Sequence, residues 1–453
     1  MSVTLDTTLH DLYSLDSDSH PVAFIYSHPS GHHAPRSTRS PPPKQFPMFP
    51  CGLESLAVEW AELRALAQRY AFVAGQMPVV FVDDASETSP NSPALSDANH
   101  SDALRGIKQL TPQQTPQLLF ASSIADIKLD RHCSVAVARP DDSLAHLRHV
   151  ICWETLYVLL SKRWLARSGL PTPKAIAVDP STTVPCSCDT DALEREIDSM
   201  LQPLDHRALP FVVKTSVGHA GRGTFCIHTE RDRHAAKQQL RDYLRKMLPQ
   251  ITLHNNHLYP ASLVIQDMIP GKSCGISLFV TKRGAMKLIG VAAEEPDSAG
   301  NYRASVTSYR DPVESQMQPY MDTAEKLATR LHRAGYYGPV GADVMTGSSG
   351  EQYIVDVNPR VTATYHLGFL RGHFTRRGLY EAAVLAPLFV RSSRDAFERH
   401  FGGELRAGRL IITGWSHGSH GETGIAGVTF GGEDIQALND LIDRVEVYAR
   451  ETP

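Results

Sequence analysis

The segment from Gly341 to Arg360 constrains the fold of this chain more than any other part of its sequence. It contains two alternating β-type runs on either side of a turn made of Gly and Ser, which is the pattern of a β-hairpin. Asp343 lies on the first run, and Asp356 and Asn358 lie on the second. Residues two apart on a strand face the same side of a sheet, and the turn can fold Asp343 back beside the other two.

Two carboxylates and an amide oxygen on one surface make an all-oxygen site for a hard cation. Mg²⁺ is favoured because it keeps waters and phosphate oxygens as its remaining ligands. Arg360 falls on the same face, where a guanidinium can hold a phosphate or an acyl phosphate. Surface hairpins also carry Asp and Asn simply as turn-forming residues. Here, however, Asp356 and Asn358 alternate with Val355 and Val357 in a run that reads as buried. A buried carboxylate needs a compensating partner, and this favours a metal site.

The bulk composition excludes several classes of protein. At 453 residues the chain is long enough for two or three domains, and its 42% hydrophobic and 21% charged residues are those of a globular protein. A formal charge of −4 provides no basic field for nucleic acid. The sequence shows neither an apolar run of about 20 residues, as a membrane helix requires, nor a signal-peptide pattern at its start. Seven cysteines, an odd number, favour reduced thiols. We therefore expect a cytoplasmic enzyme with no nucleic-acid or membrane partner.

Apolar periodicity and composition divide this α/β chain into four expected parts. A small α/β N-terminal domain should carry a disordered insertion at 84–117, which is rich in Ser, Pro, Asn and Gln. A subdomain with a glycine-rich loop follows, then one with the metal hairpin, then an extension of two strands and a helix. Continuous helices are expected at 152–168 and 375–390. The four parts are 1–150, 151–270, 271–390 and 391–453.

A lysine followed by a glycine-rich turn is the second candidate for phosphate chemistry. Lys214 ends the short buried strand FVVK, and the turn GHAGRG covers Gly218 to Gly223. Glycines let backbone N–H groups approach a phosphate, and the lysine can neutralise it. Taken alone, the turn favours an ordinary hairpin, because it is not a Walker A sequence and no helix follows it. Arg222 at its tip is either a phosphate contact or a solvated charge.

The strand exit SLVIQDMIPG, with Gln266 to Ile269, can supply the apolar slot and the backbone hydrogen bonds that a nucleotide base needs. A strand that simply leaves the core into a turn explains it equally well. His417 with His420, and Cys186 with Cys188, lie in loop-like segments without a second pair of ligands at zinc-site spacing, so we interpret both pairs as structural.

The order of these motifs resembles that of the ATP-grasp superfamily over about residues 150–375: a helix ending in GLPTP, a strand lysine, a glycine-rich hairpin, QDMIPG, and an Asp…Asp-x-Asn hairpin ending in NPR. The resemblance implies an ATP-grasp fold, in which two α+β subdomains clasp ATP. It also implies a carboxylate–amine ligase that uses ATP and Mg²⁺ (or Mn²⁺) and forms an acyl phosphate.

The resemblance also assigns roles to individual residues. Relatives often have Glu at the positions of Gln266 and Asp356, and a carboxylate at the position of Ser273. The implied catalytic residues are Arg360 and Lys214. The implied nucleotide contacts are Lys162, Lys214, Gly218, His219, Ala220, Gly221, Arg222, Gly223, Gln266, Asp267, Met268, Ile269 and Ser273, and the implied metal ligands are Asp343, Asp356 and Asn358.

The acceptor pocket is expected in segments beside the hairpin, with Glu294, Tyr302, His366 and Arg371 as candidate substrate contacts. Further similarity to ATP-grasp proteins of filamentous fungi implies specialised metabolism, with a small-molecule acid and an amine, one of them an amino acid, as substrates. A homodimer is left open. Two other functions also remain open at this point: a nucleotide-binding regulator or scaffold without ligase activity, and an ATP-dependent phosphotransferase.

Overall fold

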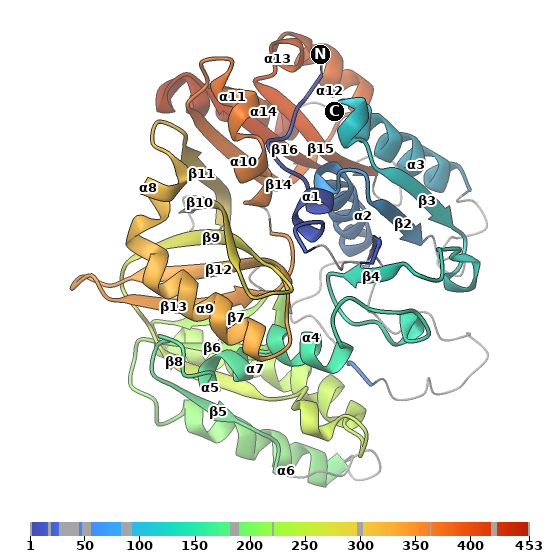
Figure 1. The fold of residues 1–453 in the computed structure, drawn as a ribbon. Helices are drawn as coiled ribbons and strands as arrows, with labels where there is room; N and C mark the ends of the chain where they lie inside the picture. Colours follow the sequence, from blue (N-terminus) through green and yellow to red (C-terminus); the bar gives the residue numbers. More distant parts are fainter. Residues whose placement is uncertain are drawn as a thin grey trace.

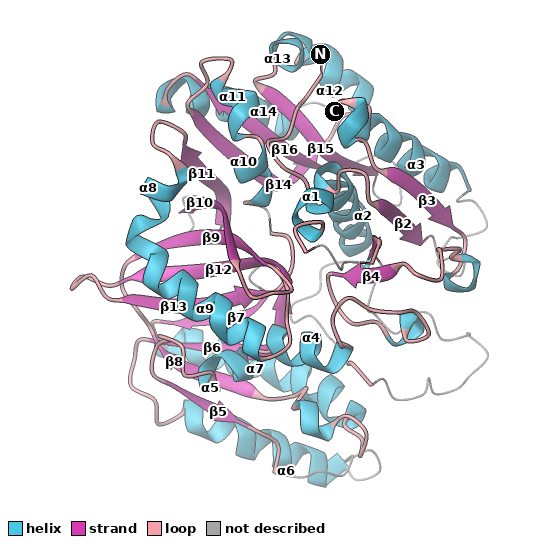
Figure 2. Cartoon of the chain, viewed as in Figure 1, coloured by secondary structure: helices cyan, strands magenta, loops and turns pink. Residues whose placement is uncertain are grey.

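The described residues of the computed structural model form three β-sheets, which Figures 1 and 2 show as an N-terminal domain, a lid and a large central sheet. The figures draw the N-terminal domain at the right and the lid at the bottom. The structure describes residues 2–16, 20–26, 45–47, 56–82, 93–181, 190–219, 222–296, 302–362, 364–417 and 424–451. No helix within these ranges is both long and apolar enough to cross a membrane.

The N-terminal domain is a parallel sheet in the order β3-β2-β1-β4. Its strands are short apolar runs such as VAFIY and PVVFV, and the helices between them make the crossovers that parallel strands require. The strands are β1 (Val22–Tyr26), β2 (Pro78–Val82), β3 (Gln117–Ala121) and β4 (Ser134–Val137), and the helices are α1 (Leu9–Tyr13), α2 (Leu56–Val73) and α3 (Pro93–Ile107).

Helix α3 corrects the prediction of a disordered insertion at 84–117. The helix occupies 15 residues of that segment, and β3 begins at its end. The polar composition hid an apolar stripe, since Ala103 and Ile107 are buried while Asp97 and Ser101 are exposed. The prediction was therefore wrong from residue 93 onward, and residues 83–92 lie outside the described part.

The lid is an antiparallel sheet in the order β5-β8-β6-β7, backed by two amphipathic helices that share its core. A salt bridge between Glu194 of α6 and Arg241 of α7 ties these helices together at 2.7 Å. The strands are β5 (Ala175–Val178), β6 (Phe211–His219), β7 (Arg222–Ile227) and β8 (Leu263–Asp267), and the helices are α6 (Thr190–Leu201) and α7 (Glu230–Met247). Two helices, α4 (Trp153–Leu160) and α5 (Lys162–Arg167), precede it in the chain.

The central sheet is antiparallel and runs in the order β13-β12-β9-β10-β11-β14-β16-β15, so β13 and β15 are its two edges. Its strands are β9 (Lys272–Val280), β10 (Met286–Pro296), β11 (Tyr302–Ser308), β12 (Gly338–Thr346), β13 (Gln352–Asn358), β14 (Glu381–Val390), β15 (Leu410–His417) and β16 (Gly424–Gly432). Its helices are α8 (Val313–Met317), α9 (Met321–Arg333), α10 (Tyr365–Phe369), α11 (Arg371–Thr375), α12 (Arg394–His400), α13 (Gly402–Ala407) and α14 (Ile435–Glu451).

Strand β14 corrects the helix predicted at 375–390. The run EAAVLAPLFV is almost continuously apolar because β14 pairs on both sides, with β11 and β16. Such a run has neither helical nor strand periodicity, so the pattern could not separate the two states. Pro387 decides against a helix interior, and the register with β16 shifts at this point.

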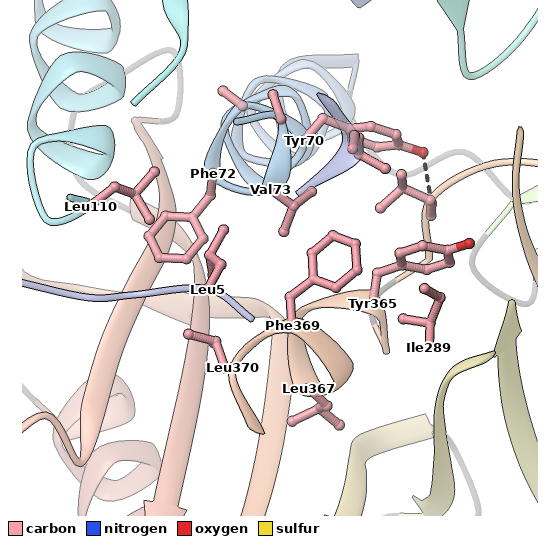
Figure 3. Close-up of a cluster of buried hydrophobic side chains, with 14 of the residues drawn as sticks. Leu5, Tyr70, Phe72, Val73, Leu110, Ile289, Tyr365, Leu367, Phe369 and Leu370 are labelled. Atoms are coloured by element: carbon pink, nitrogen blue, oxygen red, sulfur yellow. Dashed lines mark hydrogen bonds between the residues drawn. The ribbon is translucent and has the colours of Figure 1, made fainter. Parts of the chain in front are cut away.

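One hydrophobic cluster joins the N-terminal domain to the central sheet. Figure 3 shows Phe72 and Val73 of α2 facing Phe369 of α10, with Leu5 from the N-terminal segment between them. All of these side chains are buried, and each contributes roughly 1.5–3 kcal/mol relative to an exposed position. The N-terminal domain is therefore packed firmly against the sheet that carries the candidate site.

Candidate active site

The hairpin β12–β13 brings the predicted metal ligands together. Asp343 lies directly opposite Asp356 in the antiparallel pair, and Gly341 lies opposite Asn358. Opposite residues of such a pair lie on the same face with Cβ atoms about 4.5–5.5 Å apart. The two carboxylates and the amide oxygen therefore share one surface at the edge of the central sheet.

Two buried lysines reach the same strand from the side of the lid. Lys162 donates a hydrogen bond from Nζ to Oδ1 of Asp356, and Lys214 of β6 donates from Nζ to the carbonyl of Val355 at 2.5 Å. Both lysines are at most 8% exposed. The lid strand β6 and the helix α5 before the lid thus each contribute one positive charge to a site whose carboxylates belong to the central sheet.

Lys162 reaches Asp356 because the helix predicted at 152–168 is divided. Ser161 has an extended backbone with ψ of 130°, ends α4 and caps α5 by accepting a hydrogen bond from the Arg163 backbone N–H at 3.2 Å. Lys162 therefore occupies the first position of α5, against β13. A single continuous helix was the wrong prediction, and the break is what directs this lysine.

The charges of the site are strongly coupled. Burial raises the pKa of Asp343 well above its usual value, and repulsion from Glu294 and Asp356 raises it further. Burial alone would also raise the pKa of Asp356, but Lys162 and Lys214 bring it below its usual value. The pKa of Lys214 is lowered by burial, against the attraction of Asp356. Glu294 of β10, expected in the acceptor pocket, therefore adds negative charge near Asp343, and its role as a substrate contact stays a prediction.

This donor set fits Mg²⁺. Within the described ranges no three His, Cys, Asp or Glu side chains are placed to hold a metal by themselves. Asp343, Asp356 and Asn358 instead offer two carboxylates and one amide, which is the partial oxygen set that Mg²⁺ completes with waters and phosphate oxygens. A divalent cation would also relieve the repulsion that raises the pKa of Asp343.

Arg360 follows the end of β13 by two residues and adds a positive charge near Asp356. Its Nη2 donates to Oδ1 of Asn358 at 2.8 Å. Its Nε is buried and has no hydrogen-bond partner among the described residues. A buried donor without an acceptor is costly, so this guanidinium is suited to receiving an anion.

The two strands of the glycine-rich hairpin, β6 and β7, pack so closely that two glycine positions leave no room for a side chain. Gly223 has φ of +80°, and a Cβ there would lie 2.2 Å from Oγ1 of Thr215. A Cβ at Gly218 would lie 2.4 Å from the carbonyl oxygen of Arg222. Ala220 and Gly221 lie outside the described residues, and His219 is described by its backbone, which pairs with Arg222. Both described glycines are therefore needed for the close approach of β6 and β7.

Arg222 forms an ion pair with the N-terminal domain, and its role as a phosphate contact stays a prediction. Its Nη2 pairs with Glu62 of α2 at 3.0 Å. This contact spans 160 residues and links the lid hairpin to the N-terminal domain. Glu62 was missed by sequence reasoning, because nothing local to either residue indicates the pairing.

The segment predicted to hold a nucleotide base connects the lid to the central sheet. Gln266 is buried on β8, paired with Ala175 and Val212. Asp267 forms a salt bridge with Arg207. Met268 and Ile269 follow, partly buried, before β9 begins, and Ser273 lies on β9 opposite Met345.

The comparisons with known proteins agree with this geometry. A family profile described as "ATP-grasp domain" matches residues 159–364. This segment is an ATP-grasp domain. The match contains both lysines, the glycine-rich hairpin, the β12–β13 hairpin and Arg360. A search of curated proteins found no match.

Solved structures share the same fold around the ATP-grasp domain. N5-carboxyaminoimidazole synthetase from Staphylococcus aureus, complexed with ADP, aligns with a TM-score of 0.51 at 10% identity, over 94% of this chain and 97% of that one. Biotin carboxylase from Campylobacter jejuni, in a β-γ-ATP complex, aligns with a TM-score of 0.50 at 8% identity, over 94% and 91%. At these identities the likeness shows a shared fold.

Two of the predicted substrate contacts, His366 and Arg371, make hydrogen bonds within the protein. His366 is 1% exposed, its Nε2 lies 2.9 Å from the carbonyl of Arg69, and its ring stacks on Phe72. Arg371 donates to the carbonyls of Tyr309, at 3.1 Å, and Asp311, so it closes the turn after β11. These contacts hold both side chains within the fold, and their role as substrate contacts stays a prediction.

Tyr302, the remaining candidate contact, lies on β11, where its backbone pairs with Pro296. Its side chain is outside the described part of the chain, so its role as a substrate contact stays a prediction.

Proposed function

We propose that this protein is an ATP-dependent carboxylate–amine ligase that forms ADP and works through an acyl phosphate. The observation that carries the proposal is the meeting of Asp343 and Asp356 with two lysines from the side of the lid. The ATP-grasp profile and the nucleotide-bound structures of the same fold support it.

The two subdomains divide the binding of ATP between them. Lys162 and Lys214 hold the phosphates, since each is a buried ammonium at the inner surface of the site. The adenine ring lies at the connection between β8 and β9, where Gln266 to Ile269 offer backbone hydrogen bonds and apolar surface. The hairpin β6–β7 covers the phosphates with backbone N–H groups.

Asp343, Asp356 and Asn358 would hold Mg²⁺ at the opposite side of the phosphates. When bound, the cation neutralises charge on the transferring phosphoryl group. Arg360 orients the acid through its guanidinium, and its buried Nε gains an acceptor when the carboxylate arrives.

The proposed reaction has two steps. A carboxylate oxygen of the acid attacks the γ-phosphorus of ATP, the bond to ADP breaks, and an acyl phosphate forms. The amine nitrogen then attacks the carbonyl carbon, inorganic phosphate leaves, and the amine proton passes to solvent. Closure of the glycine-rich hairpin excludes water, which would otherwise hydrolyse the intermediate.

The substrates we propose are a small-molecule acid and an amine, one of them an amino acid, in specialised metabolism in the cytoplasm. This part of the proposal is supported by the similarity of YYGPVGADV and VDVNPR to ATP-grasp proteins of filamentous fungi.

ADP release with pooled substrates tests the proposal. Purified protein with ATP and Mg²⁺ is given carboxylic acids alone, amines alone, or both pools together. ADP formed only with both pools supports ligation. ADP formed with one pool alone indicates a phosphotransferase, and nucleotide binding without any turnover indicates a regulator or scaffold; either result overturns the ligase.

A further inference from the structure

The break between α4 and α5 lies against the lid strand that carries Lys214, and Figure 1 shows α5 beside β6. The Oγ of Ser161, at the break, lies 3.0 Å from the Oγ of Ser216 on β6, and both serines are buried. Ser161 directly precedes Lys162 in the chain. Ser216 follows Lys214 by two residues and so lies on the same side of β6. The two serines therefore connect the segments that carry the two lysines.

The hydrogen bond between the two serines has a direction, because a serine hydroxyl has only one proton to donate. Ser216 donates its proton to the carbonyl of Tyr259 at 3.2 Å. The proton between the two serines therefore belongs to Ser161. The oxygen of Ser161 in turn accepts from the backbone N–H of Arg163 at 3.2 Å. The result is one chain of hydrogen bonds that runs from the start of α5, through β6, to the turn at Tyr259.

The turn at Tyr259 holds the far end of this chain in place. Tyr259 has φ of +53°, in the left-handed region that residues with a Cβ seldom adopt. The guanidinium of Arg163 lies over its ring, 3.4 Å from the ring centroid. Leu258, just before it, is buried in the cluster that contains Trp153 and Tyr157 of α4. The carbonyl that accepts from β6 is thus held from both α4 and α5.

The two lysines reach consecutive residues of one strand. Lys162 donates to the carboxylate of Asp356, and Lys214 donates to the carbonyl of Val355. A lysine side chain has several rotatable bonds, so two ammonium groups stay together only when the backbones that carry them keep a fixed separation. The hydrogen bond between the two serines links those backbones within two residues of each lysine.

We infer that Ser216 is a positioning residue: with Ser161, it holds the two lysines at the separation that the phosphates of ATP require. The inference rests on the proposed function, in which both lysines bind those phosphates. Ser216 makes no contact with substrate in this arrangement and acts through the lysines alone. Loss of its hydroxyl should therefore weaken the binding of the phosphates and leave the binding of the adenosine part unchanged.

Nucleotide affinities of Ser216→Ala test this inference. The affinity for a non-hydrolysable ATP analogue is measured by calorimetry with Mg²⁺ present, and the affinity for adenosine by competition against the analogue. The variant should bind the analogue about threefold to tenfold more weakly, which is the effect of losing one hydrogen bond, and should bind adenosine as before. Unchanged affinity for the analogue, or an equal loss for adenosine, overturns the inference.

A second variant breaks the same chain of hydrogen bonds at its other end. Ser161→Gly removes the hydroxyl, while glycine remains an acceptable residue at a helix start. Its affinity for the analogue should fall by a similar factor and its affinity for adenosine should not, so it decides the question if Ser216→Ala does not fold. The double variant should lose clearly less than the product of the two factors, because both changes remove the same hydrogen bond. A loss equal to the product overturns the inference.

Ser168→Ala is the matched control. Ser168 is also a buried serine whose hydroxyl makes two hydrogen bonds, but it lies at the other end of α5. This variant should keep the affinity of the unaltered protein for the analogue. A loss as large as that of Ser216→Ala would assign the effect to α5 as a whole and overturn the inference.

The unaltered protein separates this result from failure of the proposed function. If it does not bind the ATP analogue, the proposed function fails and the inference fails with it. If it binds the analogue and Ser216→Ala binds it equally well, the inference alone fails.

Discussion

The two edges of the central sheet are both β-hairpins, and they are built in opposite ways. At one edge, β15 and β16 are buried along almost their whole length, and Trp415 is 0% exposed. At the other edge, β12 and β13 carry Asp343 and Asp356 on a half-buried face. The first hairpin is covered by α2 and α3, and the second is met by lysines from the side of the lid. One edge is therefore an apolar part of the core, and the other holds buried charges of both signs.

Removing the indole of Trp415 should have the largest effect, and on stability alone. The side chain packs against Phe397 with centroids 5.5 Å apart, so Trp415→Ala should lower the free energy of unfolding by about 3–5 kcal/mol. Urea denaturation measures the loss, and nucleotide affinity of the folded fraction should not change. Trp415→Phe, which keeps an aromatic ring, should lose much less. A large change in nucleotide affinity would show that the two edges are not independent.

At the other edge, Arg360→Ala should act on turnover and not on stability. Loss of a charge-stabilising donor costs about 10²–10³-fold in rate, while the melting temperature should stay close to that of the unaltered protein. ADP release and thermal unfolding measure the two effects. Arg371→Ala is the matched control, because that arginine closes a turn. Full turnover in Arg360→Ala would remove this residue from the site.

Lowering the pH should reduce the free energy of unfolding through a buried histidine, His373, beside the β15–β16 edge. His373 is fully buried, its Nε2 lies 3.2 Å from the carbonyl of Gly408, just before β15, and its Nδ1 has no partner in the described structure. Burial, with Arg377 and Arg376 nearby, lowers the pKa of His373 to about 4. The unfolded chain binds this proton near pH 6.5 and the folded chain near 4, so stability falls as the pH drops between these values.

At pH 5 the expected loss is about 2 kcal/mol relative to pH 7. Urea unfolding at both pH values measures it, and His373→Gln should reduce the difference. An unchanged difference in that variant would assign the acid sensitivity to other groups.

The smallest expected effect concerns the ion pair between Glu62 and Arg222, which joins the N-terminal domain to the hairpin of the lid. Glu62→Gln removes the charge that holds Arg222 to α2. A partly exposed ion pair of this kind contributes at most about 1 kcal/mol, so ATP affinity should rise roughly twofold to fivefold if Arg222 then turns to the phosphates. Calorimetry with ATP measures the change. Weaker ATP binding in Glu62→Gln would show that the ion pair helps to form the site.

The β12–β13 hairpin could be predicted because its information is local. A thirteen-residue separation and a Gly-Ser turn suffice to place Asp343 beside Asp356. The negative charge that Glu294 adds near Asp343 could not be predicted, since it depends on β10 entering the same sheet. The break at Ser161 could not be predicted either. Serine favours helix caps, but the helical spacing of the apolar residues around it is the stronger signal and indicates one continuous helix. Long-range pairings such as Arg222 with Glu62 leave no trace in the sequence.

Three consecutive residues of α2 contact three different parts of the protein. Gln68 bonds to the backbone of Trp415, Arg69 runs over two glycines of β15 and β16, and Tyr70 reaches Val361. Inserting or deleting one residue just upstream would turn all three by about 100° around the helix axis. Changes in chain length should therefore be tolerated in the surface connections of this protein and rejected within α2, whatever residue is added.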